Sequence, residues 1–330
     1  MSAKIGIASA ATAFAIFGIY PVYFKQLPDV PPFQLACHRM LWSFVTLLPL
    51  FLSQVEWKTF RDSALQPKVL GAYFVSGIAI GGLWLLYQWG IAEGHIIEIS
   101  LGFFMNPIFT VLAAVFVLKE RLRVWQWVSV GLAILGVLVI AIAYGKFPWL
   151  SISIGSLLAL YGFVKSTTPL TAVESVTIEM AYLFLPALAY LVACQVQGTG
   201  AFGHVSATQH VLLVLSGVVT VVPLLLFGYA AHLIPFSLLG LIQYIGPMLN
   251  FILGAGVYHE PFSTSKLIGF ILVWLALATY GIEGLVVKKP SSSAAIPIAT
   301  PTESDLAAKD GAETLPSTPT GDFSLVELEV

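Results

Sequence analysis

The chain has 330 residues, of which 58% are hydrophobic and only 10% are charged, and its formal net charge is −2. An average soluble domain carries about 25% charged residues, so this composition excludes an ordinary soluble fold and predicts a protein that folds in a lipid bilayer. It also excludes a nucleic-acid-binding protein, because such a protein needs a basic face or stripe that this sequence lacks.

Apolar runs long enough to span a membrane as helices, which takes about 20 residues, follow one another along the chain. The first is uncharged from Ile5 to Phe24, which is longer than the apolar core of a signal peptide, so we expect no cleavage. The alternation of a membrane barrel is absent. The sequence therefore predicts an all-α polytopic fold of ten helices, at 4–26, 33–53, 68–92, 96–118, 121–143, 147–165, 174–196, 208–232, 235–257 and 263–287.

Basic residues in short loops predict the orientation of these helices. If the N-terminus is cytoplasmic, the cytoplasmic side collects Lys4, Lys58, Arg61, Lys68, Lys119, Arg121, Arg123, Lys165, Lys288 and Lys289, and the opposite side Lys25, Lys146 and Lys266. We therefore expect a multi-pass protein of the cell (cytoplasmic or inner) membrane with both termini in the cytoplasm. Residues 290–330 are rich in Pro, Ser, Thr, Ala and acids, which predicts a disordered acidic cytoplasmic tail.

The two halves of the chain repeat one another at an offset of 140 residues. Asn106-Pro107 corresponds to Gly246-Pro247, and Glu120 corresponds to Glu260. Five spans per half is an odd number, so the second copy would enter the membrane from the opposite face, as in the inverted repeats of many secondary transporters. We expect one five-helix repeat over 1–143 and a second, inverted one over 144–289.

Pro107 and Pro247 are predicted to break their helices. Each lacks a backbone donor and leaves the carbonyl four residues earlier, that of Phe103 or Gln243, without its helical partner. A bilayer tolerates this only where the carbonyl faces protein or a watery cavity, and paired interruptions indicate a binding site near the midplane. The alternative is a kink that serves only helix packing.

Several short motifs occur in order along residues 1–289: FGIYPVYFK at 17–25, HR at 38–39 with WSF at 42–44, GGLW at 81–84, EISLG at 98–102 with NP at 106–107, YG at 161–162, VPL at 222–224, and QYIGP at 243–247. Together they resemble the RarD-type (chloramphenicol-sensitive protein) branch of the EamA family, in the drug/metabolite transporter superfamily. The resemblance implies two five-helix repeats, a central cavity lined by the first four helices of each, and outward transport.

Ionisable residues inside a membrane need a partner or a function, because their insertion costs at least about 2.5–3.5 kcal/mol. Arg39 and Glu179 occupy the second and seventh predicted helices at the same 140-residue offset. We expect both to flank the cavity, where they would pair with each other or bind a charged substrate group. The alternatives are a static structural ion pair and an Arg39 side chain that reaches outward to the membrane surface.

Other polar residues have a functional and a structural interpretation. His38 could titrate near neutral pH and serve a proton-coupled step, or stay neutral with a backbone carbonyl as its partner. Glu98, with His95 nearby, could lie at the cavity mouth or complement the dipole of its helix. Lys165 is expected to reach the cytoplasmic surface, and Glu260 to cap a helix.

Aromatic residues with a polar group suit an amphipathic ligand. The set expected to line the cavity comprises Trp84, Tyr87, Gln88, Asn106, Tyr161, Gln243 and Tyr244, although each taken singly also fits ordinary packing. Cys37 and Cys194 lie in apolar runs and are expected to pack there rather than form a disulfide.

No nucleotide-binding loop, HExxH, GxSxG or metal-ligand spacing occurs in the sequence, so we expect no enzyme, cofactor or metal site. The predicted function is a secondary transporter, and specifically an exporter of small organic metabolites or drug-like compounds by alternating access. The alternative is a non-transporting membrane sensor or assembly protein that acts through its acidic tail.

Overall fold

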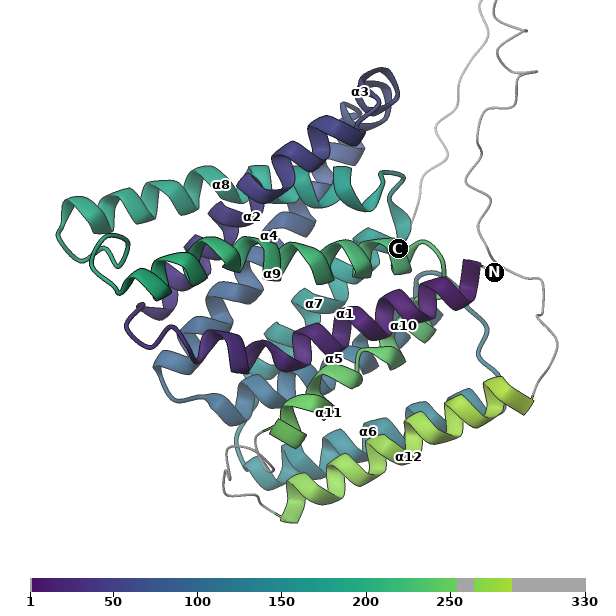
Figure 1. Ribbon diagram of the computed structural model, residues 1–330. Helices are drawn as coiled ribbons and strands as arrows, with labels where there is room; N and C mark the ends of the chain where they lie inside the picture. The colour runs from purple at the N-terminus through teal and green to yellow at the C-terminus, as the bar shows by residue number, and fades with distance from the viewer. Residues whose placement is uncertain (1, 254–263, 287–330) are drawn as a thin grey trace, which may run out of the picture. The chain divides into compact units, whose positions relative to one another are not determined.

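The computed structural model describes residues 2–253 and 264–286, and all regular structure in these ranges is helical (Figure 1). The helices are α1 (Ser2–Phe24), α2 (Pro32–Gln54), α3 (Trp57–Ala64), α4 (Pro67–Ala92), α5 (Ile96–Phe116), α6 (Val124–Tyr144), α7 (Trp149–Thr167), α8 (Ala172–Val196), α9 (Ala207–Ala231), α10 (Phe236–Ile242), α11 (Ile245–Ile252) and α12 (Thr264–Val286). The predicted tail at 290–330 and the predicted cap Glu260 lie outside the described residues.

Eight of these helices are long and apolar enough to cross a membrane, judged by length and composition: α1, α2 and α4 to α9. Helix α12 contains a shorter apolar stretch, Leu267–Tyr280. The prediction of an all-α polytopic membrane fold is thus confirmed. The short helix α3, between α2 and α4, was not expected from the sequence, because its eight residues contain three charged side chains and no long apolar run.

The described part of the predicted helix at 235–257, which ends at residue 253, contains two short helices, α10 and α11, separated at Gln243 and Tyr244. The break comes before Pro247, and the chain tightens there, so that the Gly246 N–H donates to the Gln243 carbonyl at 3.2 Å. This carbonyl thus lacks the i+4 partner of a regular helix, as expected from Pro247, and an i+3 bond takes the place of the bond that proline removes. Helix α5, in contrast, runs through Pro107 without interruption.

Matching helix pairs pack in matching ways in the two halves of the chain. Helix α1 runs antiparallel to α9, with Tyr20 Oη donating to the Val219 carbonyl at 2.9 Å and Tyr23 Oη to the Leu212 carbonyl at 2.5 Å. Helix α7 is also antiparallel to α4, because Gly90 near the end of α4 faces Leu150 near the start of α7. Helices α6 and α12 lie side by side (Figure 1) and are also antiparallel, because Arg123 at the start of α6 pairs with Glu283 near the end of α12 at 3.0 Å.

A carboxylate from one half caps a helix of the other. Glu120, in the loop after α5, accepts hydrogen bonds from the backbone N–H groups of Phe236 and Ser237, at 2.8 and 3.1 Å. The first N–H groups of any helix lack partners within the helix, and a negative charge there is favourable. Glu120 therefore stabilises the start of α10.

Small residues let the helices approach closely, as is common where membrane helices pack. A Cβ atom at Gly217 of α9 would lie 2.3 Å from the carbonyl oxygen of Trp42 in α2, and Cβ atoms at Gly136 and Gly269 would each lie 2.8 Å from the other glycine's carbonyl oxygen. These contacts hold α2 against α9 and α6 against α12, and leave no room for a methyl group.

We predict that Gly217→Ala destabilises the protein by about 1–3 kcal/mol, because the clash is with backbone that cannot rotate away. Thermal unfolding of the purified protein in detergent measures this. Gly131→Ala in α6 is the matched control, since a Cβ there meets nothing within 4 Å. Equal melting temperatures for the two variants would contradict the close crossing of α2 and α9.

Candidate functional site

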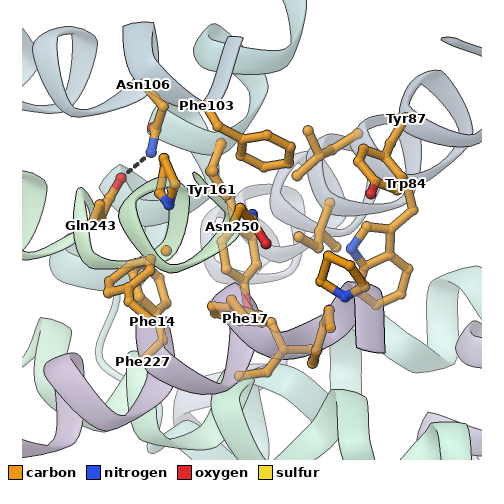
Figure 2. Close-up of a pocket in the computed structure, with 18 of the residues that line it drawn as sticks. Phe14, Phe17, Trp84, Tyr87, Phe103, Asn106, Tyr161, Phe227, Gln243 and Asn250 are labelled. Atoms are coloured by element: carbon orange, nitrogen blue, oxygen red, sulfur yellow. Dashed lines mark hydrogen bonds between the residues drawn. The ribbon is translucent and has the colours of Figure 1, made fainter. Parts of the chain in front are cut away.

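A pocket lies inside the helical bundle, where both halves of the chain contribute to its wall. Its aromatic lining comes mainly from α1, α4, α5, α7 and α9, and its polar lining from α2, α5 and the region of the α10–α11 break. The principal lining residues are Phe14, Phe17, Tyr20, Phe24, Arg39, Trp84, Tyr87, Phe103, Asn106, Tyr161, Phe227, Gln243, Pro247 and Asn250 (Figure 2). Helices α6 and α12 contribute none of the residues described as lining it.

Arg39 provides the charge of this pocket. Its side chain is 4% exposed, and its Nε donates to Thr220 Oγ1 of α9 at 3.2 Å. Its guanidinium carbon lies 4.5 Å from the ring centre of Trp84, 4.8 Å from that of Phe24 and 5.4 Å from that of Tyr20. Aromatic faces attract a cation, so the three rings stabilise the charge without neutralising it.

Amide side chains form the other polar part of the pocket. Asn106 Nδ2 donates to Gln243 Oε1, which joins α5 to the end of α10 (Figure 2), and Tyr244 Oη donates to the Phe104 carbonyl at 3.3 Å. Within the described residues, Gln243 Nε2 and Asn250 Oδ1 are buried and have no hydrogen-bond partner. An unpaired buried amide is costly, so these two atoms are available to a ligand.

A fully buried ion pair lies beside the pocket. Lys165 Nζ of α7 is 2.7 Å from Glu179 Oε2 of α8, and neither side chain is exposed. Ser76 Oγ of α4 donates to Glu179 Oε1 at 2.5 Å, and Lys165 donates to Ser175 Oγ at 2.9 Å. The ring of Tyr161, which lines the pocket, is centred 5.3 Å from Lys165 Nζ, so one side chain separates the pair from the pocket.

This ion pair corrects two expectations. Glu179 pairs with Lys165 and not with Arg39, and Lys165 is buried instead of reaching the cytoplasmic surface. The physical reason is that the two side chains contact different helices: Arg39 lies against Phe24 of α1, whereas Glu179 lies against Lys165 of α7.

The structure brings some of the predicted site residues to the pocket and leaves others outside its lining. Arg39, Trp84, Tyr87, Asn106, Tyr161, Gln243 and Pro247 line it, whereas His38, Gln88, Glu98, Pro107, Glu179 and Tyr244 are buried elsewhere. Pro107 is buried against Gly240 of α10. The pocket is therefore built from about half of the predicted set.

His38 and Glu98 have surroundings that differ from those expected. Both ring nitrogens of His38 lack a hydrogen-bond partner in the described part of the chain, so the expected backbone carbonyl is absent there; its ring lies 5.7 Å from that of Phe202. Glu98 accepts a hydrogen bond from Tyr144 Oη and lies 3.2 Å from His95 Nδ1. It therefore ties the start of α5 to the end of α6, away from the pocket.

Sequence reasoning missed the aromatic face of α1. Phe14, Phe17, Tyr20 and Phe24 recur at intervals of three and four residues, which places them on one side of a helix. That spacing could have identified them as a wall of the cavity. Thr220 and Asn250 carried no comparable signal, because single polar residues in an apolar helix are also satisfied by ordinary packing.

The fold and pocket define a multi-pass helical membrane protein with an internal cavity that is rich in aromatic side chains and has one cationic side chain among its described lining residues. The EamA-like transporter family model matches residues 4–142. The chain is 37% identical over 274 residues to Protein RarD of Streptomyces exfoliatus, covering 83% of this chain and 87% of that protein. The chain belongs to the RarD-type branch of the EamA family of transporters, as its motifs predict.

Other curated proteins and one solved structure are also similar to this chain. Protein RarD of Escherichia coli K12 is 34% identical, with 87% of this chain and 97% of that protein covered. The uncharacterized transporter YojE of Bacillus subtilis is 35% identical, with 88% and 98% covered. A crystal structure that is 14% identical has a TM-score of 0.61 and covers 86% of this chain and 99% of its own, which shows a shared fold.

We predict that Lys165→Met and Glu179→Gln each destabilise the protein by about 3–5 kcal/mol, because each substitution leaves the charge of the other residue buried and uncompensated. The double variant should lose much less stability than the sum of the losses of the two single variants. A double-mutant cycle on apparent melting temperatures in detergent measures this coupling. Additive losses would show that the two side chains do not depend on each other.

Proposed function

We propose that this protein is a secondary carrier that binds a small amphipathic organic compound in the central pocket and moves it outward across a bacterial cell membrane. The observation that carries the proposal is the pocket itself, with aromatic walls from both halves of the chain and a few convergent polar groups. Such a composition suits a ligand with an apolar body. Membership of a transporter family supports the same conclusion.

The pattern of helix contacts supports an inverted repeat of two five-helix units. At an offset of about 140 residues, α2, α4, α5 and α6 correspond to α8, α9, the α10–α11 pair and α12, with α1 corresponding to α7. Contacts follow the same rule, because α1 packs on α9 as α7 packs on α4, and α2 packs on α9 as α8 packs on α4. Two units that face a shared site can rock about it, which exposes the site to each side in turn.

In this proposal the α10–α11 break is the discontinuous element of the carrier. Unwound backbone is tolerated at membrane depth only where it lines a cavity or lies within protein, and Gln243 and Pro247 at the break both line the pocket. Proton coupling is part of the proposal, with His38 and the Lys165–Glu179 pair as the buried groups that could bind or release a proton. Flux in proteoliposomes should therefore respond to an imposed pH gradient.

We predict that Leu158→Trp blocks flux, because Leu158 lines the pocket and an indole there would occupy the ligand's space. Uptake or efflux in proteoliposomes, against an unbiased panel of metabolites, provides the measurement. The control is Leu160→Trp, two residues along the same helix at a position 39% exposed on the outer face, which should transport normally. Normal flux through the Leu158 variant would contradict transport through this pocket.

An inverted repeat of five-helix units also predicts the positions of the chain ends. Reporter fusions at the N-terminus and after residue 330 should both report a cytoplasmic location, because the helix number is even and the basic loops face inward. A fusion after Gly145, which ends α6, should report the opposite side. Termini on different sides of the membrane would exclude the proposed repeat.

A further inference from the structure

We infer that the ligand of the central pocket is an organic anion, in which an aromatic or similarly apolar body carries a carboxylate-type group bound by Arg39. This inference rests on the proposed function, since it names the class of compound that the carrier binds. Two observations support it: Arg39 has no counter-ion among the described residues, and the end of the pocket opposite Arg39 has only neutral polar groups.

Arg39 has no counter-ion in the described part of the chain. Of the described residues that line the pocket, it is the only one with a formal charge, and no carboxylate there forms an ion pair with it. An arginine in a protein does not lose its charge, and an uncompensated charge at membrane depth is costly. The positive charge is therefore open to a partner that the described residues do not supply.

Among the residues that the structure describes, each buried carboxylate has a partner other than Arg39. Glu179 pairs with Lys165, Glu283 pairs with Arg123, and Glu98 accepts from Tyr144. Glu120, which is half-buried, caps α10 through the N–H groups of Phe236 and Ser237. Moving Glu179, Glu283 or Glu120 to Arg39 would leave another charge unpaired or a helix uncapped. Glu98 is held by Tyr144 at the end of α6, away from the pocket.

The second half of the chain has a counter-ion at the position where the first half has none. Glu179, the equivalent of Arg39, is neutralised by Lys165 from α7. The offset that relates Gly18 to Gly162 places Pro21 of α1 at the position of Lys165, and Pro21 lines the pocket but carries no charge. The place of a counter-ion in the first half is thus left to the ligand.

The pocket also has an opposite, neutral polar end. Figure 2 shows Trp84 and Tyr87 at one end, the Asn106–Gln243 pair at the other, and Asn250 between them. Arg39 lies at the first end, 4.5 Å from the ring of Trp84, and the unpartnered amide atoms of Gln243 and Asn250 serve the rest of the ligand. Arginine binds carboxylates with two parallel hydrogen bonds, which suits an anion at one end of an apolar body.

The test uses the full-length protein in lipid nanodiscs and three probes of one size: phenylpropionate, phenylpropionamide and phenylpropylamine. Calorimetric titration should show the carboxylate binding about tenfold or more tightly than the amide, because a charge-assisted bond is lost in the amide, and the amine should bind most weakly. Arg39→Gln should remove the preference for the carboxylate, and Arg39→Lys should retain part of it. Lys68→Gln, which removes an exposed positive charge at the start of α4, is the matched control and should leave the preference intact.

Equal binding of carboxylate and amide, tighter binding of the amine, or no binding of any probe by the wild-type protein would overturn the inference. These outcomes do not depend on whether Arg39→Gln folds. Flux of the same probes in proteoliposomes separates this inference from the proposed function. If the carboxylate binds in a way that depends on Arg39 but none of the probes is transported, the carrier proposal is contradicted and the anion site stands. If the amide or the amine is transported and Arg39→Lys has no effect, the anion site is contradicted and the carrier proposal stands.

Discussion

The rest of this structure depends on one constraint of the bilayer: every charged side chain inside it must be neutralised by a partner or otherwise stabilised by the groups around it. The Lys165–Glu179 pair meets it by direct contact, with Ser76 and Ser175 completing the hydrogen bonds of the two charged groups. This arrangement ties α7 and α8 to α4 without adding net charge. Arg39 meets the same constraint differently, through aromatic faces that favour a cation but leave its charge in place.

The break between α10 and α11 is the second feature that depends on protein surroundings. A backbone interruption exposed to lipid would cost several kcal/mol for each unsatisfied group, and here the Gly246 N–H, the Asn106 amide and the Tyr244 hydroxyl all contribute hydrogen bonds around it. The same groups fix the break against α5. The interrupted backbone thus forms a polar part of the pocket wall.

The all-helical membrane fold was accessible from the sequence, because long hydrophobic runs report directly on what a bilayer accepts. Asn106, Tyr161 and Gln243 were expected to line a cavity because they combine polar groups with positions inside predicted helices, and they line the pocket. The partner of Glu179 was not accessible in this way, because the sequence shows the depth of a residue along its helix but not the direction in which its side chain points. Lys165 near a helix end resembles an interfacial lysine, and only its contacts with Glu179 and Ser175 in the folded chain show that it is buried.

The Glu120 cap has a mechanical consequence. The carboxylate belongs to the loop between α5 and α6 in the first half of the chain, and its two hydrogen bonds are made to the first turn of α10 in the second half. Any displacement of α10 must either break both bonds or carry that loop with it. Rocking of the two halves about the pocket, as proposed above, would therefore have to release the Glu120 cap or move the α5–α6 loop together with α10.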